Sequence, residues 1–194
     1  VNPSLPVRTL QELIQHAKAN PGKLSYGSSG IGSVAHISAE VLRASTGVEL
    51  VHVPYKTAAA AYPDVMSGQV SMVFDALPSA IQHIKTGKVR PIAMMSDRRA
   101  SLVPEVPTFA EAGYPEATLR LWVGLHGPAK LPAGVVQKLN DTLQKALAAP
   151  DVRERLATVG ADPYPASARE LAEVTRGDVE RLGRMMATAG IRGE

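Results

Sequence analysis

The chain of 194 residues contains no cysteine and few aromatic residues, with one tryptophan, two phenylalanines and five tyrosines. Without cysteine it has neither disulfides nor thiol chemistry, and its cysteine usage points to no redox compartment. The aromatic share of 4% is too small for the base-stacking surfaces of single-strand nucleic-acid binders. No apolar run approaches the roughly 18 residues that a membrane-spanning helix needs. No stretch has the pattern of a signal peptide, so export is not readable from this sequence.

Neither charge sign dominates the chain. The formal net charge is +3 and the sequence pI is about 9.3, with 45% hydrophobic and 20% charged residues. These shares are ordinary for a globular protein. Because the lysines and arginines are scattered among acidic residues, a solvated surface is favoured over a nucleic-acid patch. A modest positive field also suits the capture of small anions.

The sequence lacks a recognisable catalytic constellation. Ser33 and His36 lie one helical turn apart, but no Gly-x-Ser-x-Gly elbow precedes them, and we predict that His36 bonds locally at the start of its helix. No two histidines have the i, i+4 spacing of a helical metal site. The histidines lie on separate predicted elements, at His16, His36, His52, His83 and His126. We therefore expect no enzyme activity, no metal and no cofactor.

The first half of the chain alternates between short β-like runs and helical patterns. This alternation predicts an α/β fold with a parallel sheet and right-handed crossovers. Ligands of such sheets lie outside the carboxyl ends of the strands, so the loops after Tyr26, Val53, Phe74 and Met95 are expected at one edge. The predicted strands are 24–27, 49–53, 70–74 and 89–95, and the predicted helices are 10–20, 34–46, 57–67 and 77–86.

The second half of the chain has a different pattern. Residues 98–128 are loop-rich and hold several prolines and glycines. Helices are predicted over 132–149 and 151–159. A long last helix is expected to begin at Ser167, which has Glu170 at capping-box spacing, and to reach about residue 188.

The most informative segment is the Gly/Ser loop over residues 28–33, between the first predicted strand and the helix over 34–46. Its glycines allow sharp turns that expose backbone N–H groups, and a helix N-terminus favours anions. The candidate anion contacts are Ser28, Ser29, Gly30, Gly32 and Ser33. Ser33 is equally explained as a plain helix cap. The loop matches neither an NTPase phosphate loop nor the dinucleotide fingerprint, so the anion stays unidentified.

Two other strand ends add candidates on the same edge. Tyr55 and Lys56 follow the strand over 49–53, where Lys56 either attracts an anion or is an ordinary surface lysine. Asp75 follows the strand over 70–74. It is expected either to contact a polar ligand group or to cap the helix that begins near Pro78.

Several landmarks, taken in order, carry a resemblance to a known family. They include Ala19-Asn-Pro-Gly-Lys-Leu-Ser-Tyr-Gly-Ser-Ser-Gly, Val51-His-Val-Pro-Tyr-Lys, Gly68-Gln-Val-Ser-Met-Val-Phe-Asp, Val106-Pro-Thr-Phe-Ala-Glu-Ala-Gly and Pro150-Asp-Val-Arg-Glu-Arg-Leu. Across nearly the whole chain, the sequence resembles the solute-binding receptors of tripartite tricarboxylate transporters, the Bug-type extracytoplasmic receptors.

The resemblance implies a periplasmic-binding-protein type II-like lobe with a mostly parallel sheet, and a function without catalysis. The receptor would capture a small carboxylate in the periplasm and deliver it to membrane permease subunits. Residues 1–97 would form the ligand-binding second lobe, 98–128 the return crossing, and 129–194 the closing helices that belong to the first lobe. The expected ligand-binding residues are Ser28, Ser29, Gly30, Gly32, Ser33, His36, Tyr55, Thr57 and Asp75.

Two departures from the family pattern affect these expectations. Val1-Asn-Pro-Ser-Leu-Pro already matches the crossing into the second lobe, which predicts an N-terminally shortened version with impaired, roughly millimolar binding. The apolar faces of the closing helices would then drive self-association. Thr57 stands where the family usually has glycine, so it is expected to crowd the ligand or add a hydroxyl contact.

One alternative function belongs to a different class. Cytoplasmic small-molecule-sensing domains of transcription regulators share this lobe architecture. The absence of a helix-turn-helix pattern and of a dimer-specifying motif in the sequence counts against that interpretation. A hydrolase is disfavoured because no nucleophile and base are assembled.

Overall fold

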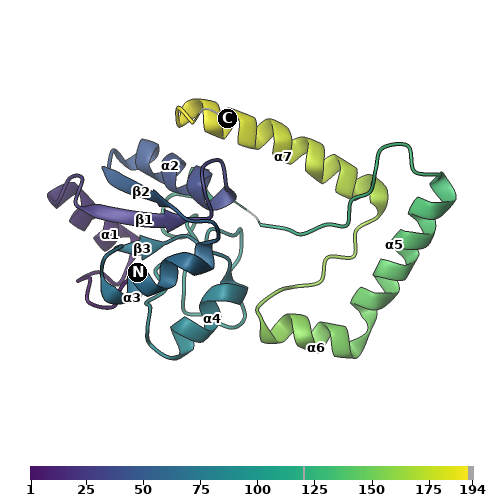
Figure 1. Ribbon diagram of the computed structural model, residues 1–194, viewed down its shortest axis with the longest axis horizontal. Helices are drawn as coiled ribbons and strands as arrows, with labels where there is room; N and C mark the ends of the chain where they lie inside the picture. The colour runs from purple at the N-terminus through teal and green to yellow at the C-terminus, as the bar shows by residue number, and fades with distance from the viewer. Residues whose placement is uncertain (120, 192–194) are drawn as a thin grey trace. The chain divides into compact units, whose positions relative to one another are not determined.

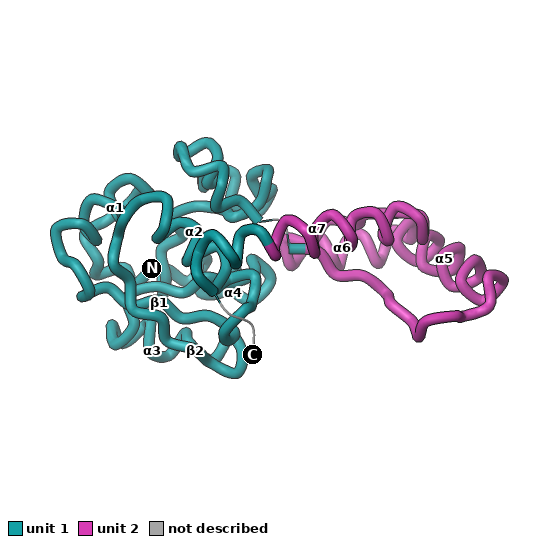
Figure 2. Tube along the Cα trace, turned by 90° about the horizontal axis from the view of Figure 1, so that it is seen from above, with its two compact units in different colours: residues 1–121, 184–194 teal, residues 122–183 magenta. Residues whose placement is uncertain are grey.

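The computed structural model describes residues 1–119 and 121–191, and its contacts divide the chain into two compact units (Figure 2). Unit 1 comprises residues 1–121 and 184–194, and unit 2 comprises residues 122–183. The predicted divisions at 97/98 and 128/129 do not coincide with these limits. Of the segments predicted from the sequence, Arg120 in the return crossing and residues 192–194 of the closing helices lie outside the described residues.

A parallel three-stranded sheet forms the centre of unit 1 in the described residues. Its strands are β1 (Leu24–Ser28), β2 (Leu50–Pro54) and β3 (Met72–Val73), in the order β2-β1-β3. Tyr26 pairs with His52 on one side and with Met72 on the other. Because all three strands are parallel, the loops that follow them leave the same edge of the sheet. The predicted α/β class and parallel sheet are confirmed.

Helices cover both faces of this sheet (Figure 1). The helices of unit 1 are α1 (Leu10–Ala19), α2 (Val34–Thr46), η1 (Ala58–Ala61), α3 (Tyr62–Ser67), α4 (Leu77–Lys85) and η2 (Pro115–Ala117). On one face, Leu24, Tyr26 and Met72 form a core with the apolar residues of α1 and α2. On the opposite face, Val53 and Val73 pack with residues of α3 and α4. Alternate residues of each strand thus serve opposite cores.

The helix limits follow the signals in the sequence. At the start of α1, the Thr9 hydroxyl accepts a hydrogen bond from the Glu12 N–H, a side-chain cap. Helix α2 begins after Ser33 and ends at Gly47, whose φ of 70° is the left-handed conformation that glycine adopts at low cost. The predicted helix over 34–46 is confirmed to the residue.

Three predicted elements need correction. The helix over 57–67 is divided into η1 and α3, because a 3₁₀ turn precedes the first α-helical residue, Tyr62. The strand over 70–74 is reduced to β3 at the edge of the sheet, and the Val73 side chain is only half-buried. The strand over 89–95 does not form.

The segment over 89–95 is apolar without being a strand because its backbone bonds lead away from the sheet. Arg90 N–H donates to the Val1 carbonyl, and Met94 N–H donates to the Pro107 carbonyl. Among the described residues, the only ladder contact that this segment makes is an isolated bridge between Met94 and Thr108. Pro91 also has no N–H to donate to a ladder. Val89 and Ile92 are nevertheless buried, so burial alone produced the strand-like pattern.

Residues 98–119 pack as part of unit 1. Val103 and Val106 join a core cluster with Leu77 and Ile81 of α4. Phe109 and Ala117 belong to the core that covers the α1 and α2 face of the sheet. This segment, which the sequence assigned to the return crossing, therefore contributes core residues to unit 1.

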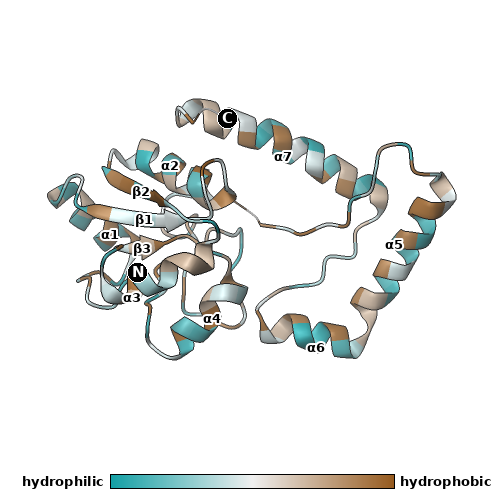
Figure 3. Ribbon diagram, in the orientation of Figure 1, coloured by the Kyte–Doolittle hydropathy of each residue, from teal (hydrophilic) through white to brown (hydrophobic). Residues whose placement is uncertain are grey.

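Unit 2 is helical, and polar and apolar residues are mixed along its helices (Figure 3). It contains α5 (Ala133–Ala148), α6 (Pro150–Thr158) and most of α7 (Ala168–Thr188). These three helices, all within the described residues, contain no buried residue, and Val135, Leu139 and Leu143 form an exposed apolar stripe on α5. The predicted capping box is confirmed, because Ser167 N–H donates to Glu170 Oε2 at 2.7 Å and Glu170 N–H donates to Ser167 Oγ at 3.2 Å.

None of the helices in the described part of the chain combines the length and the apolar character needed to cross a bilayer.

Candidate ligand-binding site

The Gly/Ser loop joins the end of β1 to the start of α2. Gly30 has a φ of 109° and Gly32 a φ of 74°, so both glycines occupy backbone conformations that other residues rarely adopt. Ile31 lies between them, and its side chain is 57% exposed. The chain therefore needs its glycines here to make two tight turns before the helix starts.

Hydrogen bonds within the loop occupy the N–H groups of its glycines. Gly30 N–H donates to Ser28 Oγ at 3.2 Å, and Gly32 N–H donates to His36 Nδ1 at 3.1 Å. Ser33 N–H donates to the Gly30 carbonyl at 3.3 Å. His36 N–H donates to Ser33 Oγ at 3.2 Å, so Ser33 caps α2 and His36 bonds locally, as the sequence predicted.

A different set of N–H groups is left for an anion. In the described part of the chain, no partner within hydrogen-bond distance is found for the backbone N–H groups of Ser29, Ile31, Val34 and Ala35. Val34 and Ala35 open α2, where the helix dipole adds partial positive charge. Gly30, Gly32 and Ser33 thus shape the loop, while their neighbours carry the available donors.

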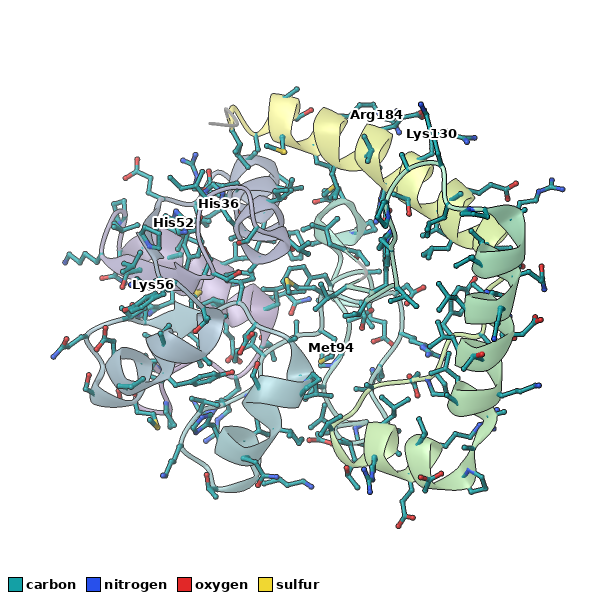
Figure 4. The ribbon with its side chains drawn as sticks, turned by 45° about the vertical axis from the view of Figure 1, so that its right-hand side comes forward. His36, His52, Lys56, Met94, Lys130 and Arg184 are labelled. Carbon is teal, nitrogen blue, oxygen red and sulfur yellow. The ribbon has the colours of Figure 1, made fainter. Side chains whose placement is uncertain are left out.

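The rings of His36, His52 and Tyr26 form a stack next to the Gly/Ser loop. Figure 4 labels the two histidines of this stack. His36 of α2 stacks on His52 of β2 with ring centroids 4.2 Å apart, and His52 stacks on Tyr26 of β1 at 4.8 Å. His52 Nε2 lies 2.7 Å from Ser28 Oγ. Each imidazole therefore contacts a side chain or backbone group of the Gly/Ser loop.

The environment of the stack favours the neutral form of each ring. Burial lowers the pKa of His36, with the Arg43 charge acting in the same direction and Glu40 opposing it. Burial also lowers the pKa of His52, and the neighbouring His36 lowers it further. Burial and the hydrogen bond to Glu40 raise the pKa of the Tyr26 phenol. Because Gly32 N–H donates to His36 Nδ1, that nitrogen must carry no proton.

A buried phenol–carboxylate bond anchors the stack. Tyr26 is 0% exposed, and its hydroxyl donates to Glu40 Oε1 at 2.7 Å, while Glu40 also forms an ion pair with Arg43 at 2.7 Å. We expect Tyr26→Phe to lower the free energy of unfolding by about 1–3 kcal/mol, because it leaves a buried carboxylate oxygen without its donor. Urea denaturation measures this change.

Tyr114→Phe is the matched control, since this half-buried tyrosine has no hydroxyl hydrogen bond among the described residues. Its free energy of unfolding should stay within about 0.5 kcal/mol of the original value. Equal losses in the two variants would contradict the assigned role of the Tyr26 hydroxyl.

The segment after β2 contributes backbone more than side chains. Tyr55 N–H donates to the Ser28 carbonyl at 3.0 Å, which brings this segment beside the Gly/Ser loop. The Tyr55 hydroxyl donates to Asp64 Oδ2 at 2.6 Å, and burial and this contact raise its pKa to about 12. Lys56 and Thr57 are exposed, so both side chains are accessible to a solute. The Tyr55 phenol is thus used within the fold.

Asp75 follows β3 and is held by three donors. Its carboxylate accepts from the Tyr62 hydroxyl at 3.1 Å, from its neighbour's backbone, Ala76 N–H, at 2.7 Å, and from the Ser79 hydroxyl. The N-cap position of α4 is Ala76, which makes no side-chain cap. Asp75 therefore connects the end of β3 to α4 through the Ser79 hydroxyl and to α3 through the Tyr62 hydroxyl.

The Ser28 hydroxyl is not accessible as a nucleophile. Ser28 and His52 form the hydrogen bond expected of a serine–histidine pair, but Ser28 is 0% exposed and its hydroxyl also lies within hydrogen-bond distance of the Gly30 N–H and carbonyl. A buried hydroxyl is inaccessible to a substrate. No group of three or more His, Asp or Glu side chains able to hold a metal occurs among the described residues. The geometry suits binding of an anion by neutral donors.

Sequence reasoning missed His52, Tyr26 and Glu40. His36 and His52 lie on separate elements, as the sequence predicted, but the pairing register sets Tyr26 opposite His52. In β1 and β2 the even-numbered residues, which include Tyr26 and His52, lie on the same face of the sheet. This alternation was the only signal in the sequence that placed the two residues on one face. Their stacking against His36 depends on the packing of α2 on that face.

Comparison with known proteins supports a single family. Residues 1–191 match the family model described as "Tripartite tricarboxylate transporter family receptor". A curated relative from Pseudomonas sp. (strain P51), "UPF0065 protein in tcbD-tcbE intergenic region", is 37% identical over 92% of this chain and 54% of its own length. "Protein BugT" of Bordetella pertussis is 30% identical over 98% of this chain and 59% of its own length. The chain thus spans little more than half the length of these curated relatives.

Solved structures agree over nearly the whole chain. "Structure of a periplasmic transporter" has a TM-score of 0.92 and 36% identity, covering 99% of this chain and 64% of that one. "R. palustris Rpa4515 with adipate" has a TM-score of 0.90 and 32% identity, covering 98% and 64%. MatC from Rhodopseudomonas palustris with bound malate has a TM-score of 0.80 and 29% identity, covering 95% and 63%. The periplasmic-binding fold predicted from the sequence is confirmed.

Proposed function

Because the chain belongs to the tripartite tricarboxylate transporter receptor family, we propose that it acts as a periplasmic solute-binding receptor for a small carboxylate. Delivery to membrane permease subunits, without chemical conversion of the solute, completes the proposed role. The solved neighbours carrying adipate and malate support the carboxylate class.

The observation that supports the proposal is the set of partnerless donors at the sheet edge. The N–H groups of Ser29, Ile31, Val34 and Ala35 are backbone donors, in and directly after the Gly/Ser loop, that have no hydrogen-bond partner among the described residues. Hydrogen bonds to a charged group contribute about 1.5–3 kcal/mol each. A carboxylate accepts several of them with its two oxygens. The loop therefore supplies a binding site for a carboxylate without an arginine clamp.

Two side chains extend the site from the loop. Lys56 is exposed after β2 and supplies a positive charge that attracts anions from solution. Ile31 presents an exposed apolar side chain between the two glycines, next to the proposed donors. A carboxylate with a hydrocarbon chain would suit both side chains, because Lys56 attracts its charge toward the N–H groups and Ile31 contacts its carbons.

A thermal-shift screen tests the proposed function. The chain is heated with adipate, malate, acetate, benzoate and glutamate, and with the uncharged diamide of adipate as the matched control. A ligand at ten times its Kd adds about 1.4 kcal/mol to the free energy of unfolding, which raises Tm. We expect at least one carboxylate to raise Tm and the diamide to leave it unchanged.

Calorimetry of the hits and an assay for conversion complete the test. The solute should be recovered unchanged after incubation with the chain, because the serine of the Ser28–His52 pair is buried. A Tm shift by the diamide equal to that by adipate would contradict the anion site. Hydrolysis of a carboxylate ester that disappears in Ser33→Ala would contradict the receptor role.

A further inference from the structure

We propose that His36 and His52 are positioning residues that hold the Gly/Ser loop in its anion-binding form as neutral imidazoles, so that protonation of His36 opens the loop and releases the anion. Release of an anion rests on the proposed function, because it presupposes that the loop binds one. The structural part of the inference, the coupling of the loop to the two imidazoles, stands on the hydrogen bonds of the described residues.

Both turns of the loop are tied to the imidazole pair. His36 Nδ1 accepts the Gly32 N–H at 3.1 Å. His52 Nε2 lies 2.7 Å from Ser28 Oγ, which in turn accepts the Gly30 N–H at 3.2 Å. The two glycine N–H groups therefore depend on one histidine each, directly or through Ser28. Since the neighbouring N–H groups of Ser29 and Ile31 take their orientation from these turns, the imidazoles determine how the donors are arranged.

Stacking makes the pair sensitive to charge. The ring centroids of His36 and His52 are 4.2 Å apart with an interplanar angle of 21°, so two positive imidazoles would repel each other strongly. His36 is 8% exposed, which leaves little water to screen a charge. The other titratable and charged groups that face the pair among the described residues are Glu40 and Arg43 of α2 and the Tyr26 phenol of β1.

Protonation of His36 would reverse the role of its Nδ1 atom. A protonated Nδ1 is a donor and cannot accept the Gly32 N–H, so the bond that closes the second turn is lost. Burial lowers the pKa of His36 below its ordinary value of 6.5. The neutral form therefore dominates at pH 7 and above, and the bond is lost as the pH falls through the lowered pKa. If only the neutral form binds, affinity falls roughly tenfold for each pH unit below that midpoint.

The structural part is tested by NMR on the ¹⁵N-labelled 194-residue chain without ligand. Between pH 8 and pH 5, the Gly32 amide resonance should move with the same midpoint as the His36 imidazole nitrogens, and that midpoint should lie below 6.5. In His36→Asn the amide oxygen occupies the position of Nδ1 relative to Cβ and does not titrate, so the Gly32 resonance should stay in place. His16→Asn on α1 is the matched control and should leave the Gly32 titration unchanged. A Gly32 amide that does not follow His36 overturns the proposal.

The functional part is tested by calorimetric titration with adipate at pH 7.5, 6.5 and 5.5. Protonation of adipate affects the original chain and His36→Asn equally, so the ratio of their affinities isolates the histidine. We expect the original chain to lose affinity by at least threefold more than His36→Asn. An affinity that rises on acidification only in the original chain would mean that the charge of His36 attracts the anion, and this would overturn the proposal. Absence of adipate binding at pH 7.5 in both proteins counts against adipate as the ligand of the proposed function, while the NMR titration still decides the coupling.

Discussion

Replacing Gly30 with valine is expected to reduce carboxylate affinity at least 100-fold while the chain stays folded. Gly30 has a φ of 109°, a conformation that a β-branched residue does not tolerate without strain. An added Cβ has open space around it, since the nearest atom is the Tyr55 carbonyl oxygen at 3.9 Å. The conflict is therefore in the backbone, and the loop must rotate and turn its donors away from the anion. A 100-fold loss corresponds to about 2.7 kcal/mol of binding free energy.

Gly113→Val provides the matched control for this experiment. Gly113 has a similar φ of 94°, no atom within 4 Å of an added Cβ, and a position outside the Gly/Ser loop. Both variants should lose about 1–3 kcal/mol of unfolding free energy from backbone strain. Only Gly30→Val should lose affinity in calorimetric titration with the carboxylate that gives the largest thermal shift. Unchanged affinity in Gly30→Val would show that the Gly/Ser loop does not bind the carboxylate.

Replacing Gly27 with valine is expected to be the most destabilising single change in the sheet. Gly27 lies in β1, the central strand, and an added Cβ would lie 2.7 Å from the Ala61 Cβ and 3.3 Å from the ring of Tyr55. Atoms of a well-packed core do not approach so closely, so β1 and η1 must separate. Overpacking of this kind costs about 3 kcal/mol, a large share of the roughly 5–15 kcal/mol that stabilises a typical domain. Urea denaturation measures the loss.

A compensating change distinguishes crowding from other causes. In Gly27→Ala combined with Ala61→Gly, one methyl group is added where another is removed, so the contact of 2.7 Å disappears. The double variant should be more stable than the sum of the single changes predicts, with a coupling free energy of about 1–2 kcal/mol. A loss of unfolding free energy in the double variant equal to the sum of the two single-variant losses would contradict the close approach of β1 and η1.

Elements with strong local signals were predictable because their causes are local. Thr9 and Ser33 cap their helices through their own hydroxyls, and Gly47 ends α2 in a left-handed conformation. Each of these interactions spans at most four residues, so a reader of the sequence sees both partners. The same holds for the capping box of Ser167 and Glu170.

Elements that depend on distant partners were predicted less well. The apolar run over 89–95 has the composition of a buried strand, but a strand also needs a neighbour to pair with. In the structure Met94 pairs with the segment around Thr108, and Arg90 bonds to the first residue of the chain. No property of residues 89–95 themselves distinguishes these partners from a fourth strand of the sheet.

The candidate site divides along the same line. The Gly/Ser loop, its two turns and its place before α2 are consequences of local sequence, because only glycine adopts these backbone conformations readily. The sequence by itself therefore determined the fold class, the family and the position of the proposed anion loop. Tertiary structure decided which N–H groups of that loop are available, since the Gly32 N–H is occupied by His36 and the Gly30 N–H by Ser28. It also brought His52 and Tyr26 beneath the loop, because the register of β1 against β2 and the packing of α2 join residues that the sequence holds far apart.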